Sequence, residues 1–299
     1  MLKTVQHKKK FWRFITILSF LLPAFLFYII FIIYPIFDSI KISLTDWNGI
    51  LPESNFVGLD NYKTLMQDKL FWNALKNTFV WVVLQLLIIA LPTLVLALMV
   101  TKVKVGMSFF RTAFYLPAIV SFSVAAVIWA KIYDPLIGPV NGVLNAVGLE
   151  VLTKNWLGDA KTVLLALVVA SSWVQYGAYM VMYITGLQHI DPQYYEAAEL
   201  DGASSFQKFF NITIPCLSNS INVVISLIII NAFRGFSMVW ATTQGGPFYT
   251  SDLISTFIFR EGFTSNRIGT GTAGGITLTI IIVGVTVLFN AIRDWRAKK

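Results

Sequence analysis

Six apolar stretches, each long enough to cross a lipid bilayer as a helix, constrain this chain more than any other feature. A spanning helix needs about 20 residues, because the hydrocarbon core is about 30 Å thick and a helix rises about 1.5 Å per residue. We therefore expect an all-α membrane protein with six transmembrane helices. The stretches lie within Phe14–Phe37, Asn77–Thr101, Thr112–Ala130, Val163–Gln188, Ser218–Ala241 and Ala273–Ile292.

Composition and charge support this location. Hydrophobic residues make up 56% of the chain and charged residues 13%, whereas about a quarter of a soluble domain is charged. The net charge is +8, but the basic residues gather at the two ends instead of alternating with aromatic residues, which argues against nucleic-acid binding. An even number of spans and the positive-inside rule then predict a multi-pass protein of the cell (inner or plasma) membrane with both termini cytoplasmic. The basic residues are Lys3, Lys8, Lys9, Lys10 and Arg13, and then Arg293, Arg296, Lys298 and Lys299.

The segments between the spans are expected to alternate sides. Lys102–Arg111 is short and basic, which is typical of a cytoplasmic loop. Asp38–Lys76 and Lys131–Lys161 then face outward, and the first of them holds enough apolar residues to fold as a lid. We divide the chain into an N-terminal part with the first span and its outward loop (1–75) and a five-helix core (76–299). The apolar residues of the first outward loop are Trp47, Phe56, Leu59, Tyr62 and Phe71.

Few residues offer covalent or metal chemistry. The sequence lacks G-x-x-x-x-G-K followed by Ser or Thr, so ATP binding through a phosphate loop is not expected. His7 and His189 are the only histidines and Cys216 the only cysteine; we predict no metal site, and expect Cys216 to be a buried small residue at a helix start. Because no acidic pair lies deep in a span, coupling to protons or sodium is disfavoured. Energy must come from elsewhere, or transport is passive.

Gly269-x-Gly271-x-x-Gly274 matches the letters of a dinucleotide fingerprint. That fingerprint acts between a buried strand and a helix of a soluble unit, whereas here it leads into a membrane span. We interpret it as a helix start whose glycines let two backbones approach closely.

Asp191–Pro215, DPQYYEAAELDGASSFQKFFNITIP, is the longest polar passage between two apolar stretches in the second half of the chain. Asp191 and Pro192 predict a helix start, and Gly202 is typical of a helix end. Ser204 with Gln207 predicts a capping box that opens a second helix. Pro215 is expected to close the unit. The passage therefore predicts a helical elbow, and the span count places it in the cytoplasm.

The elbow resembles the "EAA" loop of binding-protein-dependent ABC transporter permeases. The resemblance extends from about Lys76 to the C-terminus and points to the carbohydrate-uptake branch, the maltose and glycerol-3-phosphate permease type. It rests on the elbow letters YYEAAELDGA together with Trp173, GLQ before IDP at Gly186–Pro192, GGP at Gly245–Pro247, Tyr115-Leu116-Pro117 and Gly138–Asn141. It implies the type I ABC importer permease fold, with the elbow between helices 4 and 5.

In that family the elbow is a coupling helix that fits a cleft on a cytoplasmic ATPase. The resemblance assigns this role to Glu196, Ala197, Ala198, Asp201 and Gly202. The alanines keep one side of the helix thin, and Glu196 offers a charge to the partner. An amphipathic helix lying on the membrane surface is the alternative, but its polar face would be rich in Lys or Arg, and this one is acidic.

The resemblance also places sugar contacts in the middle of the fourth and fifth spans. There it assigns Ser172, Gln175, Tyr176, Asn231 and Arg234 to the substrate path. Polar groups beside aromatic rings suit a hydroxyl-rich ligand. Arg234, the only charge well inside a span, either lines the path, extends toward the membrane surface, or pairs with an acid from another chain.

These observations together predict the permease subunit of an ATP-driven sugar or oligosaccharide importer. The implied partners are a second permease subunit, a cytoplasmic ATPase dimer that binds the ATP, an extracytoplasmic solute-binding protein, the sugar and membrane lipid. The chain itself is expected to be no enzyme and to need no cofactor. Within this class, glycerol-3-phosphate or another anionic solute is the alternative; an ATP-independent carrier and a membrane enzyme or assembly factor are the rivals outside it.

Overall fold

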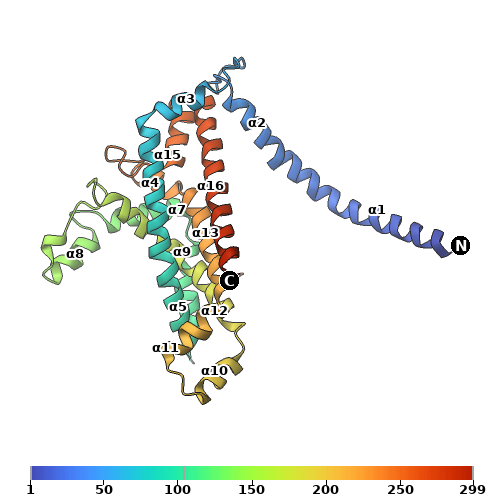
Figure 1. The fold of residues 1–299 in the computed structure, drawn as a ribbon. Helices are drawn as coiled ribbons and strands as arrows, with labels where there is room; N and C mark the ends of the chain where they lie inside the picture. Colours follow the sequence, from blue (N-terminus) through green and yellow to red (C-terminus); the bar gives the residue numbers. More distant parts are fainter. Residues whose placement is uncertain (1, 104, 298–299) are drawn as a thin grey trace. The chain divides into compact units, whose positions relative to one another are not determined.

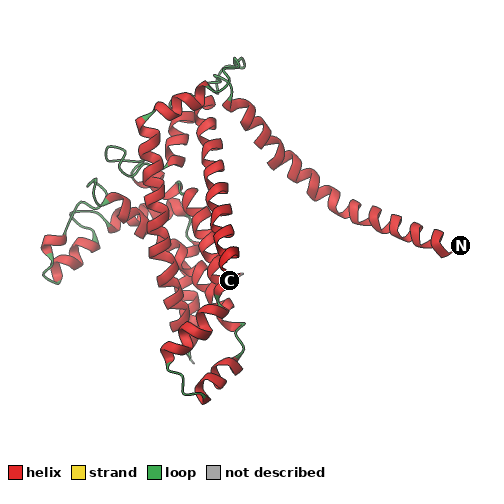
Figure 2. Cartoon of the chain, in the orientation of Figure 1, coloured by secondary structure: helices red, strands yellow, loops and turns green. Residues whose placement is uncertain are grey.

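The computed structural model describes residues 2–103 and 105–297, and Figure 2 draws this part of the chain as helices and loops only. The elements are α1 (Leu2–Tyr28), η1 (Ile29–Ile33), α2 (Tyr34–Ser43), α3 (Asp60–Gln67), α4 (Lys69–Gln85), η2 (Leu86–Ala90), α5 (Leu91–Lys102), α6 (Met107–Tyr115), η3 (Leu116–Ile119), α7 (Phe122–Ile132), α8 (Pro139–Ala146), η4 (Glu150–Leu152), α9 (Val163–Gln188), α10 (Pro192–Leu200), α11 (Ser205–Lys208), η5 (Phe209–Thr213), α12 (Ile214–Cys216), α13 (Ser218–Phe233), α14 (Ser237–Thr242), α15 (Ile254–Phe259), η6 (Arg260–Thr264) and α16 (Ile268–Ala297).

Several basic residues used to orient the chain fall outside this description. Lys104, Lys298 and Lys299 lie outside the described residues. The side chains of the N-terminal cluster, of His7 and of Arg296 are also outside them. The cytoplasmic location of the two termini therefore stays a prediction.

Four helical runs are long and apolar enough to cross a membrane without a break. They are Thr16–Ser43, Lys69–Lys102, Val163–Gln188 and Ile268–Trp295. Two further runs reach that length only as bent pairs, Met107–Ile119 with Phe122–Ile132 at 98° and Ser205–Cys216 with Ser218–Phe233 at 66°. Counting each bent pair as one span gives six, the number that the sequence predicts.

The third and fifth stretches differ from the straight helices that their apolar letters suggest. In the third, Pro117 lies in a short 3₁₀ turn, and Ser121 caps a new helix by accepting a hydrogen bond from Val124 N at 3.3 Å. In the fifth, the helix ends at Phe233 and a new one begins only at Ser237. Both breaks follow from local chemistry, because proline lacks an N–H and the Arg234–Phe236 break contains Gly235, a poor helix former.

Contacts divide the chain into two compact units, Met1–Leu65 with Glu261–Ile276, and Met66–Arg260 with Thr277–Lys299. In the second unit α9 is the central helix and packs against α4, α5, α7 and α13 (Figure 1). Its large side chains fill the core with those of α5 and α13. Buried members of this core are Ile89, Leu94, Ala97, Val100, Tyr179, Met180, Tyr183, Ile184, Leu217, Val224 and Ile228.

The second unit also contains a tightly bonded loop between α14 and α15. The fully buried Asp252 carboxylate pairs with the Arg260 guanidinium and accepts a hydrogen bond from Thr256 Oγ1 at 2.7 Å. The Arg260 guanidinium also lies over the Tyr249 ring, 4.7 Å from its centroid. Asn77 Nδ2 donates to the Asp252 carbonyl at 3.1 Å. These bonds attach the loop to α4.

The first unit brings together segments from the two ends of the sequence. The side chain of Asn61 donates to Thr45 O at 2.8 Å and accepts from Thr270 Oγ1 at 3.0 Å. Gly269 N donates to Trp47 O at 2.9 Å. A Cβ on Gly269 would overlap the Thr45 carbonyl oxygen. The interpretation of these glycines as a helix start with close backbone contact is therefore confirmed at Gly269, whereas the division at residue 75 stays a prediction.

Candidate functional site

The first limb of the elbow is α10, and its ends form as the sequence predicts. Asp191 Oδ1 accepts a hydrogen bond from Gln193 N at 2.9 Å, and Pro192 occupies the first turn. At the other end Gly202 has φ +75°, a left-handed conformation that side chains disfavour. No atom lies within 4 Å of a Cβ added there. Backbone conformation, and not lack of space, therefore makes glycine necessary.

The second limb opens with the predicted capping box. Gln207 N donates to Ser204 Oγ at 3.3 Å, and Ser204 N donates to Gln207 Oε1 at 2.8 Å. The helical run then continues through η5 and α12 to Cys216. The run ends one residue after Pro215, and a bend of 66° separates it from α13, so the unit closes where the sequence predicts.

Cys216 is exposed, so the prediction that it is buried is wrong. The neighbouring Leu217 takes the buried position instead, with 0% of its surface exposed. His189 is exposed, as expected of a polar residue outside the core; its Nδ1 lies 2.7 Å from Thr185 O.

The two limbs are held together by few bonds. Tyr195 OH and Thr213 Oγ1 lie 2.9 Å apart, and the Lys208 ammonium lies 3.5 Å from the Glu199 carboxylate. None of the nine α10 residues is buried. Helices this short are unstable without packing. The elbow, which lies at one end of the second unit in Figure 1, therefore needs a partner surface.

The predicted coupling residues lie on this free surface. Glu196, Ala197, Asp201 and Gly202 are exposed, and Ala198 is half-buried. Sequence reasoning missed Leu200, which is 90% exposed beside them.

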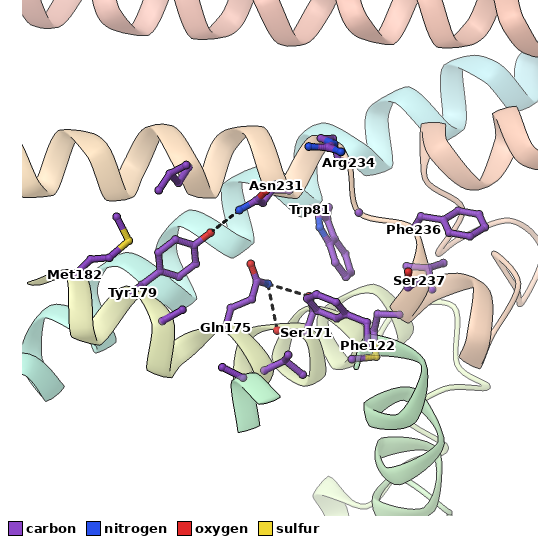
Figure 3. A pocket seen from close by; sticks show the side chains of 18 residues that line it. Trp81, Phe122, Ser171, Gln175, Tyr179, Met182, Asn231, Arg234, Phe236 and Ser237 are labelled. Carbon is purple, nitrogen blue, oxygen red and sulfur yellow. Dashed lines mark hydrogen bonds between the residues drawn. The ribbon is translucent and has the colours of Figure 1, made fainter. Parts of the chain in front are cut away.

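A cavity of about 570 Å³ lies within the second unit, between α9 and the α13–α14 break (Figure 3). Aromatic rings and polar groups share its wall, the combination that binds hydroxyl-rich ligands. Its lining comprises Trp81, Ala118, Phe122, Ser171, Val174, Gln175, Ala178, Tyr179, Met182, Leu227, Asn231, Ala232, Arg234, Gly235, Phe236, Ser237, Met238 and Val239.

Three of the five predicted path residues, Gln175, Asn231 and Arg234, line this cavity. Ser172 and Tyr176 are not part of its lining. Tyr176 OH donates to Ile88 O at 2.9 Å, and Ser172 is fully buried. Helical periodicity explains why Gln175 lines the cavity and Ser172 and Tyr176 do not. The α9 residues that line the cavity recur one or three positions apart along one face of the helix, and Ser172 and Tyr176 lie on a neighbouring face.

The break between α13 and α14 positions the charged group. Arg234 is the C-cap of α13 and is exposed, and no ion pair holds its guanidinium among the described residues. Asn231 Nδ2, one turn earlier, donates to Tyr179 OH at 3.1 Å. The aromatic residues Trp81, Tyr179 and Phe236 were missed by the sequence analysis. The only feature of the sequence that could have identified them as cavity residues is the presence of an aromatic side chain near a polar one in neighbouring spans.

Residues 80–299 match the family of binding-protein-dependent transport system inner membrane components. The chain belongs to this family. Over 271 residues, 90% of the permease and 92% of the relative, it is 35% identical to a probable ABC transporter permease protein, YurN, of Bacillus subtilis. It is 33% identical to the diacetylchitobiose uptake system permease protein NgcF of Streptomyces coelicolor, over 96% of the permease and 83% of the relative.

Solved structures agree in fold. A bacterial ABC transporter involved in the import of the acidic polysaccharide alginate superimposes with a TM-score of 0.83 and 27% identity, covering 96% of the permease and 98% of that chain. A second structure of a bacterial alginate ABC transporter, in complex with an alginate pentasaccharide-bound periplasmic protein, matches with a TM-score of 0.83, 26% identity and coverage of 95% and 96%. The predicted ABC importer permease fold is confirmed. Members of the family are membrane-embedded transport subunits, so the permease is not an enzyme.

Proposed function

We propose that the permease moves a sugar or oligosaccharide inward, as one half of a two-subunit pore. An extracytoplasmic binding protein delivers the sugar, and a pair of cytoplasmic ATPases drives the cycle. The similarity to NgcF and to the alginate transporter supports a saccharide cargo. The cavity supports it too, because Gln175 and Asn231 lie beside Trp81 and Tyr179 at its wall.

The coupling role is carried by one observation, that no residue of α10 is fully buried and seven of its nine residues are exposed. A helix that leaves most of its surface free in its own chain is suited to fill a cleft on another protein. Glu196, Ala197 and Gly202 lie on the surface that would enter the ATPase, with Ala198 half-buried beside them. ATP binding closes the ATPase pair around the elbows and so favours the outward-open state. This shift requires that ATP bind the two states with different affinity.

Co-purification tests this function directly. The permease is expressed with its genomic neighbours, solubilised in mild detergent and assayed for ATP hydrolysis with candidate binding proteins loaded with maltodextrins, arabino-oligosaccharides or diacetylchitobiose. We expect an ATPase and a second permease to accompany it, and one loaded binding protein to stimulate hydrolysis. A chain that purifies alone and moves solute without ATP would contradict the proposal.

An anionic cargo is the second candidate, and Arg234 favours it. Its guanidinium is the only charge in the cavity lining, and it has no ion-pair partner among the described residues. The alginate transporter, whose cargo is acidic, is a structural neighbour. Adding alginate oligosaccharides to the same panel separates the two cargoes. An Arg234→Gln variant should then lose uptake of the acidic cargo only.

A further inference from the structure

Gln85 is a buried polar residue that does not line the cavity. It is the last residue of α4, and only 1% of its surface is exposed. Its Nε2 is buried without a hydrogen-bond partner among the described residues. An orphaned amide inside a membrane span is costly, and an apolar residue of the same size would avoid that cost. The one bond that Gln85 makes through its side chain must therefore account for its presence.

That bond is one of three that together fix the orientation of the Gln175 carboxamide. Gln175 Nε2 donates to Gln85 Oε1 at 3.2 Å, to Ser171 O at 3.2 Å and to Ser171 Oγ at 3.1 Å. The Ser171 carbonyl can only accept, so a flipped carboxamide would bring two oxygens together. All bonds to Gln175 that the structure contains therefore use its nitrogen. Figure 3 shows its oxygen turned away from Ser171, in the direction of Asn231.

The Gln85 bond differs from the other two because it comes from another helix. Ser171 lies one turn before Gln175 on α9, so its bonds allow the Gln175 side chain to move with its own helix. The bond from α4 ties that side chain across the bundle. The three acceptors around Gln175 Nε2 outnumber its two hydrogens, so neither is left for a ligand. Asn231 adds a second oxygen on this wall, because its Nδ2 already donates to Tyr179 OH.

We propose that Gln85 is a positioning residue that makes this wall of the cavity a hydrogen-bond acceptor. Gln175 Oε1 and Asn231 Oδ1 then receive hydrogen bonds from the hydroxyl groups of a neutral sugar ring. A carboxylate has no proton to donate and is repelled by these oxygens, so a sugar ring whose carboxylate faces them is disfavoured here. This inference rests on the proposed function and narrows its cargo: the ring that contacts α9 is neutral, whatever group Arg234 binds.

The test measures sugar binding to the cavity itself. Saturation-transfer NMR on the detergent-solubilised assembly, without the binding protein, gives the Kd of neutral trisaccharides (maltotriose, arabinotriose, xylotriose) and of an alginate trisaccharide. Gln85→Met keeps the side-chain length but removes the acceptor. We expect the Kd of the best neutral probe to rise about three- to tenfold, the effect of one lost hydrogen bond. The Kd ratio should shift toward the alginate probe, because a Gln175 side chain that is no longer tied to α4 can turn its N–H groups toward a carboxylate.

Three further measurements separate positioning from a structural role. Gln85→Met should not lower the thermal unfolding midpoint, since it removes an orphaned amide. Gln85→Glu, which keeps an acceptor oxygen, should restore the wild-type preference for neutral sugars. Thr93→Val is the matched control, because Thr93 is fully buried in the same span and its hydroxyl bonds only to its own helix, to Ile89 O at 2.6 Å and Ala90 O at 3.3 Å.

The outcomes are distinguishable. Unchanged Kd values in Gln85→Met, or a Kd change accompanied by a lower unfolding midpoint, would overturn the positioning role while leaving the proposed function intact. A wild-type assembly that binds neither class of probe would contradict the sugar path through this cavity, and the inference would fall with it.

Discussion

At the scale of single residues, Gly202 and Asp252 show two different ways in which the structure constrains the residue type at a position. Gly202 is surrounded by open space and is held only by its left-handed backbone. Asp252 is buried and is held by its charge partner, Arg260, whose side chain is 17% exposed. The first constraint affects the shape of one exposed loop, whereas the second affects the stability of the fold. Substitutions should separate them.

Replacing Gly202 with Ala should uncouple ATP hydrolysis from transport. The left-handed conformation costs a non-glycine residue about 1–2 kcal/mol, enough to shift the angle between the elbow limbs without disturbing the buried core. We expect sugar uptake per ATP hydrolysed to fall at least about fivefold, with normal amounts of protein in the membrane. Gly148→Ala is the control: Gly148 has φ +78° and equally open surroundings, but lies in another loop. Equal uptake per ATP in both variants would contradict the coupling role.

Replacing Asp252 with Asn should destabilise the second unit. Removing one partner of a buried pair leaves an uncompensated charge, which costs about 3 kcal/mol. We expect a clearly lower thermal unfolding midpoint in detergent. Asp60→Asn removes a carboxylate whose partner, Lys63, is 71% exposed, so its midpoint should change little. Similar midpoints for the two variants would show that the Asp252 pair does not stabilise the fold.

At the scale of elements, the two limbs of the elbow depend on each other through Tyr195 and Thr213. Their hydroxyl groups form the hydrogen bond that joins α10 to the run that follows it. No residue of α10 is fully buried, so this bond, the Lys208–Glu199 pair and the packing of the half-buried Tyr195 against the core provide its attachment. The elbow should therefore be among the least protected parts of the second unit.

Tyr195→Phe should loosen the elbow before it affects the bundle. The loss of one hydrogen bond costs about 1 kcal/mol. We expect amide hydrogen exchange in α10 to become about fivefold faster, with α9 unchanged. Thr213→Val should give the same acceleration, and the double variant should add nothing to it. An additive double variant would indicate that the two hydroxyl groups act independently.

Sequence and structure agree best where the chemistry is local. The caps at Asp191, Ser204 and Gly202 involve neighbours within four residues, so their letters determine them. The 98° bend after Pro117 was not predicted, because the apolar stretch continues across it. Apolar composition predicts that a segment enters the membrane, but it does not predict the direction of the helix axis. The bond between Gln85 and Gln175 joins residues 90 positions apart. Likewise, which α9 residues face the cavity depends on the packing of α4 and α13 against that helix, which no single stretch specifies.

At the scale of the whole molecule, the first unit is made from the two ends of the sequence. Asn61 and Thr270 are separated by 209 positions and yet share a hydrogen bond. Gly269 permits this association, because any larger residue would meet the Thr45 carbonyl. The first unit therefore requires glycine at position 269, because no larger residue fits there.

Gly269→Ala should disrupt this unit. The added methyl group would force the backbones apart and break the bond from Gly269 N to Trp47 O. We expect faster proteolysis between residues 44 and 60 of the purified protein, at least about fivefold, since overpacking typically costs about 1–3 kcal/mol. Gly284→Ala, in the same helix but with nothing within 4 Å of the added Cβ, should be cleaved at the wild-type rate. Equal rates would mean that the contact at Gly269 is dispensable.

The bonds from Trp47 and Asn61 to the start of α16 join parts of the chain that are synthesised at different times. A ribosome makes the loop at residues 44–61 more than 200 residues before its partners Gly269 and Thr270 exist. Chains fold from the N-terminus during synthesis, so this loop leaves the ribosome long before it can close. The nascent chain must keep it soluble and unpaired through the insertion of every intervening helix. Premature termination before residue 268 would therefore yield a chain whose loop at residues 44–61 lacks its partners in α16, and which quality-control proteases can recognise by that exposed loop.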